Sequence, residues 1–322
     1  MSSTLTKTPL HFALLGCGGI AARHARRLRR FDGVRCSFAS RDRTRAAEYR
    51  ERLGGERAFG SYAAALASDD VDAAVITTPT AEHLQLTLAA LGAGKHVIVE
   101  KPAFLRSADV DAVETAALAS GRRVLVAENY AYKPLLGLLR RTIQNGDIGE
   151  VRYLTINALK SQCPGGWRDD VALAGGGALF EGGIHWIHLL GSLGLTVESV
   201  QGYRPGGLGE IERSMLVVAQ FEEGAVGTLH HAWDMRSTLR GLRLSRVYGT
   251  GGSIAFESNG LFVLVRGRST RLVFPGLRDI AGYRAMFADF IACLSEGREP
   301  RMTLARARRD LELVETAYRT LP

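Results

Sequence analysis

Residues 10–21 read LHFALLGCGGIA, an apolar run followed at once by Gly16, Gly18 and Ala21 in a GxGxxA pattern. The run is typical of a buried strand, and the residues from Ile20 onward favour a helix. In this context the first glycine permits a tight turn and the second lets the backbone approach a pyrophosphate. The small third residue allows helix and strand to pack closely. The stretch therefore predicts a dinucleotide-binding loop, whose expected cofactor contacts are Gly16, Gly18, Gly19 and Ile20.

Similar apolar runs recur through the first 127 residues, with segments of helical length and composition between them. Near-continuous apolar character suits strands that are buried on both faces. The alternation predicts βαβ units and a doubly wound parallel sheet. We therefore expect an α/β fold that begins with a dinucleotide-binding Rossmann domain over residues 1–127.

After residue 128 the pattern changes. A helix-like stretch near 132–143 precedes a long strand candidate, VRYLTINALK, and a Gly-rich polar loop. A helix is expected to begin around Ala178, and several strand-like runs follow between 197 and 274, with Gly and Asn at the expected turns. We expect residues 128–322 to form an α+β domain with a mostly antiparallel sheet. Its two closing helices, near 279–296 and 303–320, could pack back on the first domain.

Composition excludes several classes of protein. The chain has 322 residues, of which 46% are hydrophobic and 23% charged, as in ordinary globular proteins. No apolar run approaches the ~20 residues that span a bilayer, and the opening MSSTLTKTPL lacks the apolar core of a signal peptide. The four cysteines show no metal-like spacing. We expect a cytoplasmic protein with reduced thiols, no metal site and no membrane partner.

The formal net charge of +8 is concentrated near the start, where residues 10–60 hold 12 Arg against 5 acidic residues. Nucleic-acid binding is one interpretation of such a patch. Arg23, Arg27 and Arg30 recur at helical spacing, however, which favours a solvated helix face. The interleaved aromatic residues of single-strand binders are missing. We therefore expect no nucleic-acid partner, and the same field would favour the phosphates of a dinucleotide.

The end of the second strand candidate, VRCSFASRD, bears on the choice of cofactor. An NAD-specific domain usually places an acid there for the adenosine ribose, but Ser40 and Arg41 occupy the position. A hydroxyl beside a guanidinium suits the 2′-phosphate of NADP. The alternative makes Arg41 a surface residue and Asp42 the ribose acid or a helix cap. We expect NADP, with NAD possible.

Further motifs identify a family resemblance. GKHVIVEKP at 94–102, TTPTAEH at 77–83 and GGGALFEGGIHWIHLL at 175–190 follow the glycine loop in order. Together they resemble the Gfo/Idh/MocA oxidoreductases, named after glucose-fructose oxidoreductase and inositol dehydrogenase, over nearly the whole chain. The resemblance implies a Rossmann domain followed by a large open-faced sheet domain that assembles into a homodimer or homotetramer. It also implies hydride transfer between a nicotinamide and a hydroxyl or keto carbon of a sugar, polyol or sugar derivative.

In the family pattern Lys101 lies beside the nicotinamide and the substrate hydroxyl. It directly follows the run HVIVE, and ligands of α/β proteins bind at the carboxyl ends of parallel strands. His83 is expected near the nicotinamide, or alternatively exposed in the first turn of a helix. The Lys101–Pro102 bond could be cis. The remaining cofactor contacts that the motifs imply are Thr78, Pro79 and Glu100.

The second family motif commonly has aspartate four residues before a histidine that acts as acid and base. Here these positions are Glu181 and His185, with Lys101 as the expected stabiliser of the developing alkoxide. Glu181 is expected to orient His185, or alternatively to support the helix dipole while His185 packs in the core. Glu181, His185 and His188 would share one helical face, and such a set can bind a metal. We expect none, because the cofactor motifs already account for the site.

Substrate contacts are expected from five side chains in the second domain. Aromatic faces pack on sugar rings, and Lys or Arg grips carboxylate or phosphate, although each side chain could equally belong to an interface or the surface. A paired Lys160 and Arg168 would favour an anionic sugar derivative. The five are Tyr130, Lys160, Trp167, Arg168 and His188.

Two other functions fit the same motifs. One is glycoside hydrolysis with tightly held NAD, as in some proteins of this family. The other is a non-catalytic sensor that binds NADP. The presence of both Lys101 and His185 favours an oxidoreductase of the dehydrogenase or reductase type.

Overall fold

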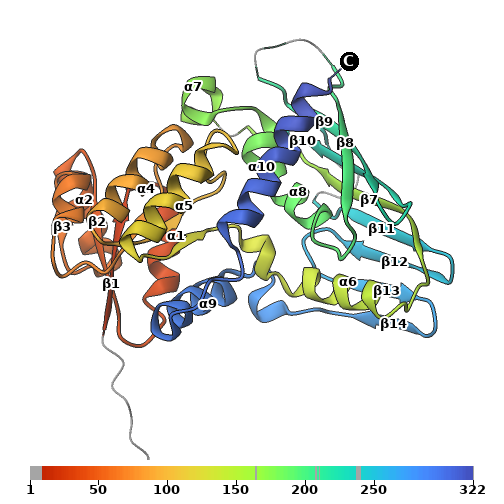
Figure 1. Ribbon diagram of the computed structural model, residues 1–322, viewed down its shortest axis with the longest axis horizontal. Helices are drawn as coiled ribbons and strands as arrows, with labels where there is room; N and C mark the ends of the chain where they lie inside the picture. Colours follow the sequence, from red (N-terminus) through yellow and green to blue (C-terminus); the bar gives the residue numbers. More distant parts are fainter. Residues whose placement is uncertain (1–8, 164, 207–208, 210, 237–240, 322) are drawn as a thin grey trace, which may run out of the picture. The chain divides into compact units, whose positions relative to one another are not determined.

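The computed structural model describes residues 9–163, 165–206, 209, 211–236 and 241–321 (Figure 1). The chain forms two compact units. Unit 1 comprises Met1–Phe104, Ala108–Ala127 and Phe287–Leu304. Unit 2 comprises Leu105–Ser107, Glu128–Met286 and Ala305–Pro322. A segment from the closing helices, Phe287–Leu304, thus clusters with the first unit.

Unit 1 is built on a six-stranded sheet with the order β3-β2-β1-β4-β5-β6, in which all pairs of neighbours are parallel. The prediction of a Rossmann α/β fold is confirmed. The central strands are buried on both faces, as their continuous apolar sequences require. The strands are β1 Leu10–Leu15, β2 Val34–Ala39, β3 Ala58–Phe59, β4 Ala73–Ile76, β5 His96–Val99 and β6 Val124–Val126.

The helices of unit 1 bury small and apolar residues and expose charge. In α1 the buried residues include Ala21, Ala25 and Leu28, whereas Arg23 and Arg30 are exposed in and just after this helix. The basic stretch is therefore a solvated helix face. The helices are α1 Gly19–Leu28, α2 Arg43–Leu53, α3 Tyr62–Leu66, α4 His83–Gly92 and α5 Asp109–Ser120, with a short 3-10 turn at Thr80–Glu82 and part of α9 Tyr283–Glu296.

Unit 2 contains an eight-stranded sheet with the order β14-β13-β12-β11-β7-β10-β9-β8. Only β7 and β10 pair in parallel, so the prediction of a mostly antiparallel sheet is confirmed. The strands are β7 Val151–Leu159, β8 Val197–Tyr203, β9 Ser214–Phe221, β10 Val226–Ala232, β11 Leu244–Gly249, β12 Gly252–Glu257, β13 Val263–Arg266 and β14 Thr270–Val273.

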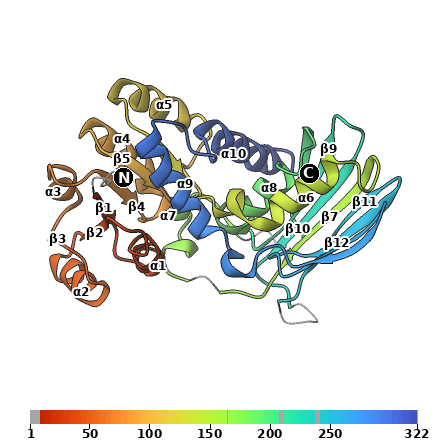
Figure 2. The ribbon, with the colours of Figure 1, turned by 90° about the horizontal axis from the view of Figure 1, so that it is seen from below.

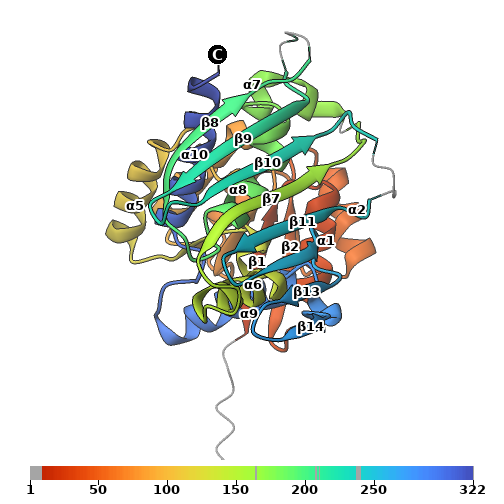
Figure 3. The same cartoon turned by 90° about the vertical axis from the view of Figure 1, so that its right-hand side faces the viewer.

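Helices cover one face of this sheet. Figure 2 shows α6, α8 and α10 on the same side of the strands, and Figure 3 views the opposite face, over which no labelled helix of unit 2 lies. Leu154, Leu229 and Val247 point to the covered side and are buried. The helices and helical turns are η2 Asn129–Tyr132, α6 Pro134–Gln144, η3 Gly166–Asp169, α7 Val171–Ala174, η4 Leu179–Gly183, α8 Ile184–Leu190, η5 Leu277–Asp279 and α10 Leu304–Arg319.

The bare face carries large side chains. Tyr153 is 64% exposed, Tyr248 40% and Val226 37%, and the strand register places all three side by side across β11, β7 and β10.

None of the described helices is long and apolar enough to cross a membrane. All four cysteines are free thiols, and only Cys163 is exposed.

The helix expected from Ala178 differs in its first turn. Leu179–Gly183 forms a π-helical turn, and the α-helix proper begins at Ile184. The adjacent glycines Gly182 and Gly183 favour α-helix poorly, which weakens the first turn. Wider π turns of this kind often occur at functional sites.

The glycine loop offers a matched test of backbone strain. Gly16 has a φ of +101°, and a Cβ there would lie 3.1 Å from the Thr77 hydroxyl, whereas a Cβ on Gly18 would meet nothing within 4 Å. Gly16→Ala should lower the free energy of unfolding of the apoprotein by about 1–3 kcal/mol, the usual cost of a strained backbone. Gly18→Ala should change it by less than ~0.5 kcal/mol. Urea titration followed by circular dichroism measures both, and equal losses would contradict this account of the loop.

Candidate active site

The glycine loop of unit 1 joins β1 to α1. Gly18 is the N-cap of α1 in an extended conformation, with no side chain to cap the helix. Nothing lies within 4 Å of a Cβ built on Gly18 or Gly19, so there is open space beside the start of α1. Helix N-termini of this kind bind anions through backbone N–H groups and the helix dipole. The loop therefore fits a dinucleotide pyrophosphate, at the edge where the parallel strands end.

The end of β2 presents Ser40 and Arg41 beside this loop. Ser40 is buried, and its hydroxyl accepts a hydrogen bond from the Asp42 amide at 3.2 Å. The Arg41 side chain is 77% exposed and lies 3.4 Å from a Glu82 oxygen. Asp42 caps α2 by accepting from the Thr44 amide at 2.9 Å. The helix-cap interpretation of Asp42 is thus correct, and its carboxylate is already bonded to the backbone.

His83, the first residue of α4, is buried rather than exposed. The alternative that it is an exposed helical residue is wrong, because its ring lies between two segments of the site. Nε2 is 3.0 Å from the carbonyl oxygen of Thr78, and Nδ1 is 2.9 Å from that of Pro102. Burial lowers the pKa of His83, although the two carbonyls oppose the shift. His83 therefore joins the 77–83 motif to the segment that carries Lys101.

Thr78 and Pro79 lie between β4 and α4, and the hydroxyl of Thr78 is buried without a partner among the described residues. An unpaired buried hydroxyl is costly, so it is available to a ligand at this edge of the sheet.

Glu100 and Lys101 follow β5 directly. Glu100 is buried, bonds to Nε2 of His24 from α1 and accepts a hydrogen bond from the Lys101 amide at 3.1 Å. Burial alone would raise the pKa of Glu100, but the bond to His24 and the nearby Lys101 charge outweigh it and lower the pKa. The Lys101–Pro102 peptide bond is cis. The backbone that carries Lys101 is thus fixed by a buried carboxylate.

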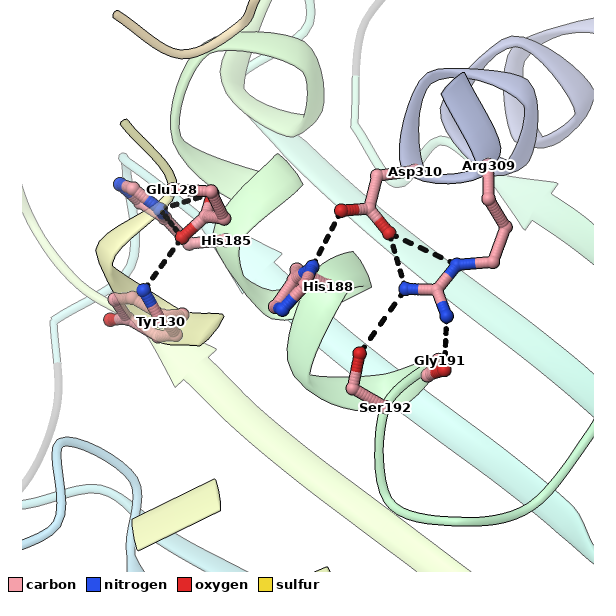
Figure 4. A network of polar contacts seen from close by, with 8 residues as sticks. All are labelled: Glu128, Tyr130, His185, His188, Gly191, Ser192, Arg309 and Asp310. Carbon is pink, nitrogen blue, oxygen red and sulfur yellow. Dashed lines mark hydrogen bonds and ion pairs between the residues drawn. The ribbon is translucent and has the colours of Figure 1, made fainter. Parts of the chain in front are cut away.

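In unit 2 the imidazole of His185 is held by a carboxylate that the sequence analysis did not select. Nδ1 of His185 lies 2.7 and 2.8 Å from the two oxygens of Glu128 (Figure 4). Glu128 also accepts a hydrogen bond from the Tyr130 amide at 2.9 Å, and the Tyr130 ring stacks on His185 with centroids 4.6 Å apart. Glu128 lies two residues after β6, near the carboxyl end of a parallel strand where functional residues gather, and this signal could have identified it.

The electrostatics of this pair are strong. Burial would raise the pKa of Glu128, but the positive charge of His185, its hydrogen bond and the neighbouring His188 lower it from 4.5 to about 2. The carboxylate is therefore ionised throughout the neutral range, and it favours the protonated imidazole. The His185 side chain remains 18% exposed, so part of the ring can reach a ligand.

Glu181 forms an ion pair with an arginine of the second unit. It lies in the π-helical turn and accepts a hydrogen bond from Nε of Arg168 at 2.9 Å. The Arg168 guanidinium lies over the ring of Trp167, 4.6 Å from its centroid. Glu128 holds the imidazole of His185 at Nδ1, and the role of Glu181 in orienting this ring stays a prediction. The structure brings Trp167, Arg168 and Glu181 together.

His188 was predicted to contact substrate, but it is 1% exposed and packs between helices. Its Nδ1 lies 2.6 Å from Asp310 of α10, and Asp310 also bonds to Arg309 (Figure 4). Arg309 donates in turn to the carbonyl of Gly191 at 2.6 Å. We therefore assign His188 to the packing of α8 against α10.

Other polar side chains surround the covered face of the sheet near His185. Tyr130 is buried, and Lys160 ends β7 with intermediate exposure. His231 of β10, which the sequence analysis missed, is buried with no hydrogen-bond partner for either ring nitrogen among the described residues. Burial lowers its pKa to about 3, helped by the charge of Lys160 and opposed by Glu181. The arrangement places in this cluster a neutral imidazole whose nitrogens lack partners among the described residues.

The described residues contain no group of three or more His, Cys, Asp or Glu side chains arranged to hold a metal ion. What the site offers is a buried carboxylate–imidazole pair for proton transfer, flanked by aromatic rings and cations.

Comparison with known proteins agrees with this architecture. Residues 10–128 match the oxidoreductase family with an NAD-binding Rossmann fold, and residues 137–255 match the GFO/IDH/MocA C-terminal domain. The chain is 28% identical to a 4-carboxy-2-hydroxymuconate-6-semialdehyde dehydrogenase of Sphingobium sp., over 92% of this chain and 94% of the relative.

A second relative is D-xylose 1-dehydrogenase (NADP(+)) 2 of Haloferax volcanii, 24% identical over 95% of this chain and 96% of the relative. Among solved structures, levoglucosan dehydrogenase in complex with NADH and levoglucosan superposes with a TM-score of 0.85 at 22% identity, covering 97% of this chain and 98% of that one. The two matched domains cover most of the chain in the expected order, so the protein belongs to the Gfo/Idh/MocA oxidoreductase family.

Proposed function

We propose that this protein is an NAD(P)-dependent oxidoreductase that transfers a hydride between the nicotinamide and a hydroxyl or keto carbon of a sugar, polyol or sugar derivative. The observation that carries the proposal is the buried carboxylate of Glu128 on Nδ1 of His185. The names of the relatives support it, since levoglucosan dehydrogenase and D-xylose 1-dehydrogenase both act on sugars. In this proposal residues 1–127 hold the dinucleotide, and residues 128–322 bind substrate and form the oligomer.

His185 is the proposed acid and base. Because Nδ1 faces Glu128, we place the proton exchange with a substrate hydroxyl at Nε2. Removal of the hydroxyl proton creates imidazolium, whose charge the ionised Glu128 stabilises. Lys101 is the proposed cation that stabilises the developing alkoxide, on a backbone fixed by Glu100. Trp167, Arg168, Lys160 and Tyr130 are the proposed substrate contacts.

When bound, the nicotinamide supplies the hydride chemistry. The residues proposed to hold the cofactor lie around the carboxyl edge of the parallel sheet, where Gly18 and Gly19 leave room for backbone approach. They are Gly16, Gly18, Gly19, Ile20, Ser40, Arg41, Thr78, Pro79, His83, Glu100 and Lys101.

We further propose NADP as the preferred cofactor. Arg41 is exposed and pairs with Glu82 at 3.4 Å, a pair weak enough in solvent for the guanidinium to turn to a phosphate. Asp42 is committed to capping α2, so it is a poor ribose acid.

We also propose that the protein is a homodimer or homotetramer built through the bare face of the eight-stranded sheet. Tyr248, Tyr153 and Val226 form an exposed row there, in register across three strands. Contiguous apolar surface of this kind marks an interaction site.

Removing the imidazole tests the catalytic assignment. His185→Ala should lower kcat by about 10²–10⁴-fold, the usual contribution of a general acid or base, without weakening cofactor binding. The control is His96→Ala, since His96 begins β5 at the edge opposite Lys101. Initial rates of NADP⁺ reduction over aldoses and polyols, with fluorescence titration of NADPH, measure both quantities. Unchanged turnover in His185→Ala would reassign the base.

The low pKa of Glu128 predicts a specific acid sensitivity. Because its pKa of about 2 in the folded protein lies below the ordinary value of 4.5, its stabilising effect is present above pH 4.5 and is lost as pH falls toward 2. Glu128→Gln should lower the free energy of unfolding by roughly 1–3 kcal/mol at pH 7. In this variant the free energy of unfolding should also fall less between pH 4.5 and pH 2 than it does in the wild type. Denaturant titrations across this pH range measure the free energy of unfolding, with exposed Glu150→Gln as the control. If this free energy changed with pH in the same way in Glu128→Gln and wild type, the stabilising pair of Glu128 and His185 would be refuted.

The cofactor proposal predicts a selective loss. Arg41→Ala should weaken NADPH binding by about 1.5–3 kcal/mol, because a hydrogen bond to a charged group is removed, and should leave NADH binding unchanged. The control is Arg35→Ala, an exposed arginine near the start of the same strand, β2. Isothermal titration calorimetry gives the affinities of wild type and of both variants for NADPH and for NADH. Equal losses for both cofactors in Arg41→Ala would exclude the assignment.

The oligomer proposal predicts that a charge on the bare sheet face dissociates the assembly. Tyr153→Asp should sediment as a monomer, whereas wild type sediments as two or four copies. Leu118→Asp is the matched control, because Leu118 is 86% exposed on α5 of the other unit. Sedimentation velocity measures the mass, and an unchanged mass in Tyr153→Asp would place the interface elsewhere.

A further inference from the structure

Two buried cations in unit 2 have no part in the proton transfer described above. Lys133 precedes α6, is 6% exposed, and its Nζ lies 4.0 Å from the centroid of the Tyr130 ring. Arg243, just before β11, is 8% exposed, and its Cζ lies 5.3 Å from the centroid of Trp186. Lysine and arginine are almost never this buried unless they are paired.

Neither cation is paired within the part of the chain that the structure describes. No described residue accepts a hydrogen bond or forms an ion pair with Nζ of Lys133 or with the guanidinium of Arg243, and Nε of Arg243 is buried without a partner. The flat faces of Tyr130 and Trp186 lie against the two cations, and cation–π contacts offset only part of the cost of burying a charge.

The carboxylates nearest to this pair are already engaged. Glu128 holds His185 and the Tyr130 amide. Glu257 accepts from the amides of Asn259 at 3.0 Å and Leu261 at 3.2 Å. Burial and the charge of Arg243 lower the pKa of Lys133 to about 8, although Glu257 and Glu128 oppose the shift. The charge of Arg243 thus acts against the protonated form of Lys133.

Aromatic contacts connect both cations to the proposed base. The ring of Tyr130, beneath Lys133, stacks on His185 with centroids 4.6 Å apart. The same ring meets the Trp186 ring edge-on, with centroids 5.1 Å apart, and the Arg243 guanidinium lies over Trp186. An anion that engaged both cations would therefore be held beside the group proposed to move the substrate proton.

We propose that Lys133 and Arg243 form a subsite for an anionic group of the substrate, a carboxylate or a phosphate, so that the sugar is an acid or a phosphate ester. The inference rests on the proposed function, whose substrate site it deepens. A guanidinium and an ammonium together match the oxygens of either anion, and binding would supply the partners that both cations lack.

Binding of matched sugars tests the subsite. The probes are D-glucuronate and D-glucose 6-phosphate, each compared with neutral D-glucose, titrated calorimetrically into the full-length protein saturated with NADP⁺. At least one anionic probe should bind about tenfold more tightly than D-glucose, as expected for added charge-assisted hydrogen bonds. The two arms distinguish a carboxylate from a phosphate. Equal affinities for all three sugars would overturn the proposal.

Substitution of each cation tests whether Lys133 and Arg243 cause the preference for an anionic sugar. Lys133→Met and Arg243→Met should each reduce the ratio of anionic to neutral affinity by about tenfold or more. Arg140→Met is the matched control, because Arg140 is exposed on α6, the helix that Lys133 precedes. Arg243→Met should also leave Tm unchanged or raise it, since it removes a buried unpaired charge. A lower Tm together with an unchanged affinity ratio would show that Arg243 is structural and would overturn the subsite.

Turnover of the same sugars separates this inference from the proposed function. Anion-selective binding without hydride transfer to NADP⁺ would keep the subsite and overturn the function. Hydride transfer from sugars that bind with equal affinity would keep the proposed function and overturn the subsite.

Discussion

The bond between the Glu128 carboxylate and Nδ1 of His185 sets the chemistry that unit 2 can perform. A buried carboxylate would be unstable alone, so it needs the imidazole and the Tyr130 amide as partners. In return it fixes the ring orientation and favours its protonated form. The imidazole keeps 18% of its side-chain surface exposed, and this is where we propose that it exchanges a proton with a ligand. Tyr130, stacked on the ring, limits its rotation further.

Much of the fold follows from local sequence. Continuous apolar runs such as LHFALL predict buried parallel strands because both faces of that sheet are covered, and the glycine pattern fixes the turn after β1. The change to punctuated, shorter runs after residue 128 predicts the antiparallel sheet. The first turn of the helix around Glu181 escaped prediction, because the weakness of Gly182 and Gly183 as helix formers was not weighed there.

The site was only partly predictable. Lys101 and His185 lie in recognisable motifs, but the partner of His185 comes from a position 57 residues away, and no spacing rule links it to the histidine. Helical periodicity pointed to Glu181 instead, because residues four apart on a helix usually share a face. His188 shows the same limit, since its partner Asp310 is 122 residues distant. His231 and Arg243 gain meaning only from burial, which sequence does not reveal for isolated polar residues.

The central claim is direct hydride transfer, and isotope transfer tests it most directly. D-Xylose and D-glucuronate carrying deuterium at every carbon would be incubated with the protein and NADP⁺, and the reduced cofactor analysed by mass spectrometry. The account predicts that deuterium from at least one sugar appears in the reduced cofactor. Conversion of a sugar with its deuterium released to water, or no reduced cofactor from either sugar, would contradict it.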